Sequence, residues 1–163
     1  MRKELLKNLK LDDGHLTLEI FESEGEHIIR GVLSDENGKW YPVERGVPCF
    51  LDGGLRPDQS KFREEHELQP INAENADLTE SEQLETNVTF SDKWGKFRDY
   101  GTLAEHQEFL FDWYVKKFGL SNIDELREFY SGKKRVLEVG PGSGFNAQFV
   151  SASTKGEVFT VDI

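Results

Sequence analysis

The sequence predicts an α/β protein in which a small β-rich module is followed by helices that lead into the first β-α-β unit of a doubly wound parallel sheet. Two patterns carry this prediction. Short runs of alternating apolar and polar residues occur near the N-terminus, and a strand, a glycine turn, a helix and a second strand follow one another near the C-terminus. The predicted parts are a β-rich module at 1–52, an acidic linker at 53–87, and helices with an incomplete α/β domain at 88–163.

Strand-like patterns define the N-terminal module. Apolar and polar residues alternate from Leu16 to Ile20, and a second apolar run covers Ile28 to Leu33. Asn37-Gly38 follows that run, and this dipeptide favours the tight turn of a hairpin. We therefore expect a small antiparallel sheet.

Two further strands are expected in the same module, at 40–43 and 47–51. Each contains a proline, Pro42 or Pro48. Since proline has no N–H to donate to a neighbouring strand, these residues predict strand ends or a sheet edge.

The segment 53–87 has the composition of a connector. It contains Gly53-Gly54, Pro57 and Pro70, and from Glu64 to Glu85 it is rich in acidic residues without one Lys or Arg. A solvated linker is the preferred interpretation, and an acidic docking segment is the alternative.

Two helices are predicted ahead of the C-terminal unit. Apolar residues recur at helical spacing from Leu103 to Phe118, and Gly119 is placed to end that helix. Ser121 and Asp124 have the spacing of a capping box that opens a second helix, which Gly132 closes.

The last part of the chain has the order of a β-α-β unit. The expected elements are a strand at 135–139, a turn at 140–144, a helix at 145–153 and a strand at 157–161, which ends at Asp162. Such units are normally wound right-handed.

The turn Gly140-Pro141-Gly142-Ser143-Gly144 is the motif that indicates chemistry. Glycine at alternate positions lets the backbone adopt positive φ and lie against a ligand. The N–H groups at the start of the following helix then face a nucleotide-like group. These five residues are therefore predicted to bind a cofactor.

Two acidic residues narrow the choice of cofactor. Asp162 lies 22 residues after Gly140 (162 minus 140), near the spacing of about 20 residues at which a carboxylate reaches ribose hydroxyls. Glu138 would repel a dinucleotide's phosphates but suits an ammonium group, and Phe145 stands where a dinucleotide fingerprint requires a small residue. S-adenosylmethionine has the required properties.

The run Val136 to Gly144, with Val161-Asp162-Ile163 after the helix, resembles the first motif and the second-strand acid of the class I, Rossmann-like S-adenosylmethionine-dependent methyltransferases. The resemblance implies that the glycine turn cradles the cofactor, that Glu138 positions its methionine end, and that Asp162 holds the ribose. It also implies lead-in helices before the first strand. Trp94 and Tyr100 in that region would cover the pocket, although core packing is the preferred interpretation of both.

The N-terminal module is more distantly similar to the zinc-ribbon-like domain of the tRNA-methyltransferase activator family. The similarity lies in Gly31 to Leu33, Tyr41 to Val43 and Gly46 to Leu51. Ser34 and Asn37 stand where that family's second cysteine pair would be, so a degenerate, metal-free module is expected.

Composition limits the partners that we expect. A net charge of -11 and a pI near 4.8 oppose nucleic-acid and anionic-membrane binding, and no apolar stretch is long enough to span a bilayer. The single cysteine, Cys49, allows no internal disulfide and no thiolate metal cluster. We expect a soluble, cytoplasmic protein with no metal.

The predicted parallel sheet has two strands, and such sheets usually have five or more. We therefore expect a truncated domain that binds cofactor weakly, is inactive alone, and self-associates through its open sheet edge. The catalytic residues and the methyl acceptor stay unassigned. Two other functions are open: a dinucleotide-dependent oxidoreductase, and a noncatalytic interaction module with a vestigial glycine turn.

Overall fold

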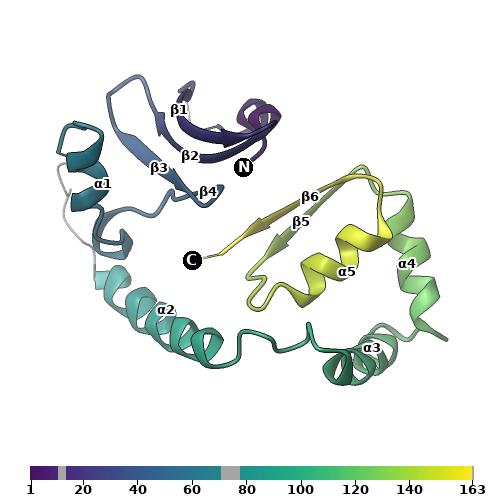
Figure 1. The fold of residues 1–163 in the computed structure, drawn as a ribbon. Coiled ribbons are helices and arrows are strands. Elements are labelled where there is room, and N and C mark those ends of the chain that lie inside the picture. The colour runs from purple at the N-terminus through teal and green to yellow at the C-terminus, as the bar shows by residue number, and fades with distance from the viewer. Residues whose placement is uncertain (11–13, 71–77, 163) are drawn as a thin grey trace. The chain divides into compact units, whose positions relative to one another are not determined.

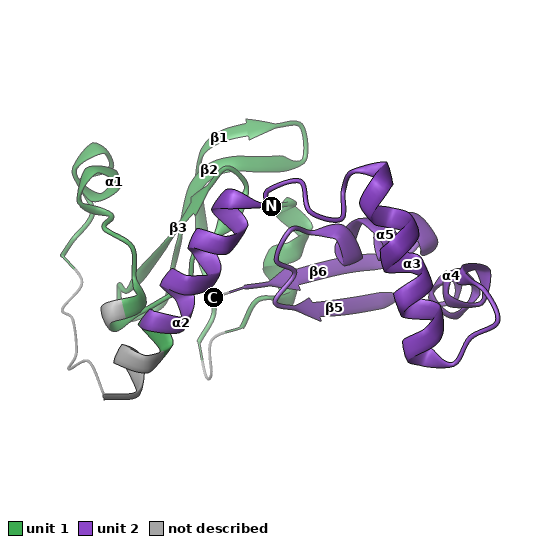
Figure 2. Cartoon of the chain, turned by 90° about the horizontal axis from the view of Figure 1, so that it is seen from below, with its two compact units in different colours: residues 1–84 green, residues 85–163 purple. Residues whose placement is uncertain are grey.

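The computed structural model describes residues 1–10, 14–70 and 78–162 and has a mixed α/β fold (Figure 1). The chain divides into two compact units, unit 1 at Met1–Leu84 and unit 2 at Glu85–Ile163 (Figure 2). Unit 1 contains a four-stranded antiparallel sheet, and unit 2 contains a two-stranded parallel sheet. The expected mixed α/β class is thus confirmed, with an antiparallel sheet in the N-terminal part and one parallel strand pair in the C-terminal part.

Unit 1 is built on a sheet with the strand order β1-β2-β3-β4. The turn between β2 and β3 contains Asn37 and Gly38, as predicted, and Gly38 has a φ of 79°. Asp35 fixes this turn because its carboxylate accepts the N–H groups of Asn37 and Lys39. The elements of unit 1 are η1 (Lys3–Asn8), β1 (Thr17–Glu24), β2 (His27–Ser34), β3 (Trp40–Glu44), β4 (Val47–Pro48), η2 (Gly53–Leu55) and α1 (Ser60–Glu65).

The two prolines shorten the pairing of β3 with β4. Pro42 lies inside β3, which is flanked by β2 and β4, so the expectation of a strand end or edge is wrong for this residue. Its carbonyl accepts the N–H of Cys49, but its ring nitrogen has no hydrogen with which to complete the pair. The strand predicted at 47–51 is accordingly limited to Val47–Pro48.

The core of unit 1 has two clusters of buried residues. One contains Ile28, Leu33, Tyr41 and Val43, and the other contains Val32, Trp40 and Phe62. Phe62 belongs to α1, so part of the segment that was predicted as a linker contributes a buried side chain to this core. His66, just after α1, stacks on Phe21 with ring centroids 3.7 Å apart.

Unit 2 contains most of α2 and all the elements that follow it. These elements are α2 (Leu78–Lys96), α3 (Ala104–Phe118), α4 (Ile123–Ser131), β5 (Arg135–Val139), α5 (Phe145–Ser153) and β6 (Glu157–Val161). The sequence pattern predicted α3, α4, α5 and both strands, but it did not predict α2. This helix has little contrast between its faces, because acidic and polar residues occur all round it.

The ends of α3 and α4 show one correct and one wrong prediction. Gly119 ends α3 in the left-handed conformation, with a φ of 66°, as expected. The first helical residue of α4 is Ile123, and its N-cap is Asn122 rather than Ser121. The Asn122 side chain accepts the N–H groups of Asp124 and Glu125 at 2.9 and 3.2 Å.

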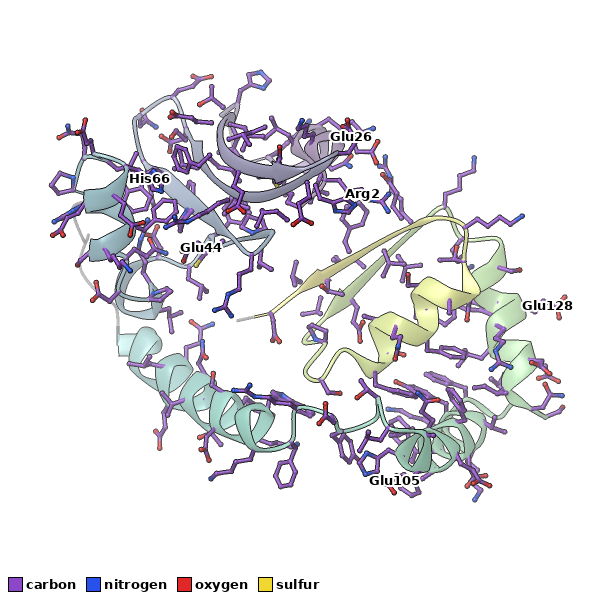
Figure 3. All side chains as sticks on the ribbon, in the orientation of Figure 1. Arg2, Glu26, Glu44, His66, Glu105 and Glu128 are labelled. Carbon is purple, nitrogen blue, oxygen red and sulfur yellow. The ribbon has the colours of Figure 1, made fainter. Side chains whose placement is uncertain are left out.

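Strands β5 and β6 pair in parallel around α5, as the β-α-β prediction requires. Leu126, Phe149 and Val150 form the buried centre of unit 2, and Val136 and Val158 of the two strands pack against them. Acidic side chains such as Glu105 and Glu128 point outward from α3 and α4 (Figure 3). Among the described residues, no helix is long and apolar enough to cross a membrane.

Candidate functional site

The loop between β5 and α5 has the backbone that its glycines predict. Gly140, Gly142 and Gly144 have φ values of 69°, 56° and 80°, all in the left-handed region. The N–H of Gly144 donates to the carbonyl of Pro141 at 2.9 Å, which closes a turn around Ser143. We call residues 140–144 the glycine loop.

The strand register brings Asp162 to the same end of the sheet as the glycine loop. Val139 and Val161 are paired residues, and the N–H of Gly140 donates to the Val161 carbonyl at 2.8 Å. Asp162 is the next residue after Val161, and it is exposed. The predicted ribose-binding acid therefore lies beside the first glycine of the loop.

Glu138 lies in β5, on the side of the sheet that faces the helices. Its Oε1 accepts a hydrogen bond of 2.9 Å from the Asn146 side chain, in the first turn of α5. Its Oε2 is buried and has no hydrogen-bond partner among the residues that the structure describes. A buried carboxylate oxygen without a donor is costly, so Oε2 is the polar atom of this region whose hydrogen-bonding capacity is unused by the described residues.

The negative charge of Glu138 affects the pKa values of two tyrosines. Burial raises the pKa of both Tyr114 and Tyr130 above the ordinary tyrosine value, and the negative charge of Glu138 adds to the rise in each case. Both phenols therefore stay neutral near physiological pH. They come from α3 and α4, so Glu138 lies close to the packing centre of unit 2.

Trp94 of α2 covers one position of the glycine loop. A Cβ placed on Gly142 would lie 2.5 Å from Trp94 Cζ2 and 2.7 Å from Trp94 Cε2. A Cβ on Gly140 or Gly144 would meet no atom within 4 Å. Gly142 is therefore required by the tryptophan ring as well as by its own φ, while the other two glycines face open space.

Phe145 turns into the core at the start of α5. Its side chain is 7% exposed, and its ring lies 5.6 Å from that of Phe111 and 6.3 Å from that of Tyr114. Gly101 is packed against it, because a Cβ on Gly101 would lie 2.8 Å from the Phe145 Cβ. This bulky residue anchors the helix start where a dinucleotide fingerprint has glycine.

A pocket of about 570 Å³ lies in the segment that joins α2 to α3. Phe97, Arg98, Tyr100 and His106 are among the residues that line it. Tyr100 is 40% exposed, so its preferred interpretation as a core residue is wrong. Its ring lies 6.4 Å from that of Trp94, so a row of aromatic rings connects this pocket with the glycine loop.

Two of these features were not predicted from the sequence. Asn146 as the partner of Glu138 had no local signal, since the two residues meet because α5 folds back over β5. The contact of Trp94 with Gly142 joins residues nearly fifty positions apart, and no spacing rule reports such a pair.

The comparisons with known proteins identify no family. No protein-family model matches the chain, and no curated protein matches it.

Proposed function

We propose that this chain carries the cofactor-binding part of an S-adenosylmethionine-dependent methyltransferase, with β5, α5 and β6 as the first β-α-β unit of a doubly wound sheet. The observation that carries the proposal is that Glu138 Oε2, beside a loop of three left-handed glycines, is buried and accepts no hydrogen bond from the residues that the structure describes. The methyl acceptor is not assigned.

The residues at this site fit S-adenosylmethionine better than a dinucleotide. The cofactor brings an ammonium group, a donor of the kind that none of the described residues offers to Glu138 Oε2, and it brings no phosphate for the carboxylate to repel. The open spaces at Gly140 and Gly144 leave the loop backbone accessible to the adenosine part. Asp162, at the same edge, has a carboxylate that accepts hydrogen bonds from ribose hydroxyls.

Each residue then has a role in binding and orientation. The glycine loop holds the cofactor against the backbone, Glu138 orients its methionine end, and Asn146 keeps the Glu138 carboxylate in place. When bound, S-adenosylmethionine supplies a methyl group on a positively charged sulfur, which is open to in-line displacement. No residue is assigned to proton transfer.

Calorimetric titration with S-adenosylhomocysteine tests the proposal, with NAD as the competing ligand. The titration is done on the full chain. We expect saturable binding of S-adenosylhomocysteine and none of NAD. Asp162→Asn is expected to weaken binding about tenfold or more, because hydrogen bonds to charged groups contribute about 1.5–3 kcal/mol each. Glu128→Gln, an equal charge change at an exposed position of α4, is the matched control.

Each other result has a defined meaning. Binding of NAD in preference would favour a dinucleotide-dependent oxidoreductase. No binding of either ligand by a folded protein would reject the cofactor site.

A noncatalytic interaction module is the second candidate function. Phe109 and Trp113 are four residues apart on α3 and are 63% and 42% exposed, which is unusual for such large apolar side chains. If this surface of α3 binds a partner protein, replacing both residues by serine should abolish that binding. Binding of S-adenosylhomocysteine should stay unchanged, because it uses the glycine loop.

A further inference from the structure

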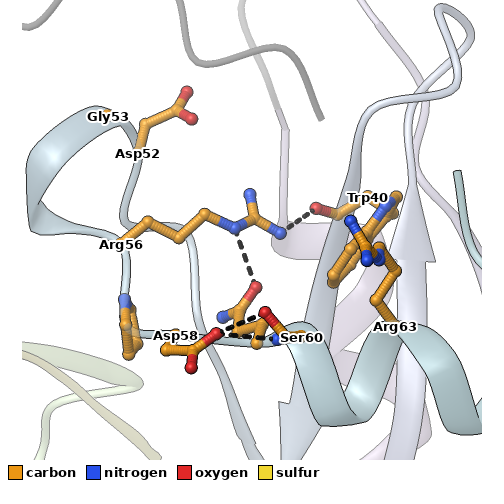
Figure 4. Close-up of a pocket in the computed structure, with 9 residues that line it drawn as sticks. Trp40, Asp52, Gly53, Arg56, Asp58, Ser60 and Arg63 are labelled. Atoms are coloured by element: carbon orange, nitrogen blue, oxygen red, sulfur yellow. Dashed lines mark hydrogen bonds between the residues drawn. The ribbon is translucent and has the colours of Figure 1, made fainter. Parts of the chain in front are cut away.

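A second pocket lies in unit 1, between the start of β3 and the segment 52–63 (Figure 4). Its volume is about 230 Å³, which is below the usual range of about 300–1,000 Å³ for drug-sized ligands. It belongs to the antiparallel-sheet unit and shares no residue with the glycine loop. The pocket is therefore suited to a small molecule and is separate from the cofactor site proposed above.

Arg56 is held rigidly at this pocket. Its guanidinium lies 4.6 Å from the centre of the Trp40 ring, its Nε donates to Gln59 Oε1 at 2.7 Å, and its Nη2 donates to the Trp40 carbonyl at 2.9 Å (Figure 4). The remaining nitrogen, Nη1, is buried and has no hydrogen-bond partner among the described residues. All these partners are uncharged, so none of them neutralises the guanidinium.

The two carboxylates of the pocket are already occupied. Asp52 pairs with Lys39. Asp58 accepts the backbone N–H and the hydroxyl of Ser60, at 3.0 and 2.7 Å, and these two hydrogen bonds lower the pKa of Asp58. The charge of Asp52 still acts on Arg56, and that of Arg63 acts on Asp58, but neither acid forms an ion pair with either arginine.

Arg63 of α1 adds a second guanidinium-bearing side chain to the lining of the pocket, to which Trp40 also belongs (Figure 4). Neither Arg56 nor Arg63 forms an ion pair with any residue in the part of the chain that the structure describes. Burial lowers the pKa of Arg56, and the nearby charge of Asp52 only partly opposes this effect. Two guanidinium groups that form no ion pair with a described residue are unexpected at one cavity of a chain with a net charge of -11.

We propose that this pocket binds a small molecule through a carboxylate or phosphate group, which is held by Arg56 and Arg63. Planar guanidinium groups match the oxygens of both anions in geometry, and a partly buried one gains most from such a partner. Trp40 and Gln59 fix Arg56 in advance, so little side-chain entropy is lost on binding.

The test is calorimetric titration of the full chain with inorganic phosphate and with acetate, at matched ionic strength. The anion that saturates identifies the chemical group. We expect Arg63→Ala to weaken binding about tenfold or more, because a charge-assisted hydrogen bond is lost. Lys61→Ala removes the same charge from an exposed position of α1, outside the pocket, and should leave binding unchanged.

Arg56→Lys is the second variant, because it keeps the charge and removes the planar fork. It should weaken binding while the two-dimensional NMR spectrum stays that of a folded protein. The proposal is overturned if neither anion saturates, or if Lys61→Ala weakens binding as much as Arg63→Ala, since that result would indicate general attraction to positive charge.

Discussion

At the residue scale, Gly142 must be glycine for two separate reasons, its backbone conformation and its packing against Trp94. Its φ of 56° is strained for any residue with a Cβ, and its α-carbon lies under the Trp94 ring. Gly140, with a φ of 69°, has the same backbone requirement, but no side chain packs against the position of its Cβ within 4 Å. A loss of cofactor binding after substitution of Gly142 therefore does not by itself report a contact with the cofactor.

We predict that Gly142→Ala destabilises the protein more than Gly140→Ala. Backbone strain alone should cost about 1–2 kcal/mol at each position, and displacement of the Trp94 ring should add about 1–3 kcal/mol at Gly142. Denaturant unfolding of both variants, with and without Trp94→Ala, measures the coupling in a double-mutant cycle. Equal costs at the two glycines would show that the ring moves aside freely.

At the same scale, Glu138 should control the ionisation of two tyrosines. Tyr114 and Tyr130 have raised pKa values in the folded protein, through burial first and Glu138 second. The unfolded chain therefore loses these protons first as the pH rises. The stability that the neutral phenols contribute is complete below the ordinary tyrosine pKa of about 10 and is lost as the pH rises through the raised values.

Glu138→Gln should lower both tyrosine pKa values without restoring the ordinary value, because burial remains. Ultraviolet titration of tyrosinate measures this change, and Glu128→Gln serves as the exposed control. Unchanged tyrosine titration in Glu138→Gln would mean that the carboxylate does not act on the phenols.

At the scale of elements, the start of α4 depends on one side chain. Asn122 accepts two N–H groups of the first turn, and Asp124 and Glu125 in that turn favour the positive end of the helix dipole. Ser121 stands outside the helix and provides no side-chain cap.

We expect Asn122→Ala to lower the free energy of unfolding by about 1 kcal/mol and Ser121→Ala to change it little. Thermal or denaturant unfolding of the two variants makes the comparison. If Ser121→Ala lowers the free energy of unfolding more than Asn122→Ala does, then Ser121, the residue that the capping-box spacing indicates, is the N-cap.

At the scale of the whole molecule, the sheet of unit 2 has an uncovered apolar face. Leu137 and Val139 of β5 are 62% and 72% exposed, and Val161 of β6 is 48% exposed. Parallel sheets are normally buried on both faces. This apolar face lies next to the open sheet edge, and burying it between two copies would stabilise the expected self-association.

We predict that the chain self-associates in a concentration-dependent way and that Val139→Lys weakens this association. Sedimentation velocity over a range of concentrations gives the measurement, with Val47→Lys on the exposed edge of unit 1 as the control. A chain that is monomeric at every concentration would contradict the prediction.

Much of the fold was predictable because its signals are local. The turn at Asn37-Gly38, the αL end of α3 at Gly119 and the order of β5, α5 and β6 each depend on residues close together in the chain. Helix α2 was missed because its first half lies in the acidic segment interpreted as a linker, while α5, with no more contrast between its faces, was predicted from its place after the glycine turn.

The sequence by itself determined the glycine loop, the parallel pair of strands and the placement of Glu138 and Asp162 at that pair. Residue type and strand order are enough for these features, since glycine alone accepts positive φ freely and parallel strands end at the same edge. The tertiary structure alone decided the partner of Glu138, the cover over Gly142 and the arginine pocket at Trp40. Each of these depends on residues brought together by packing, for which neighbouring positions in the sequence give no signal.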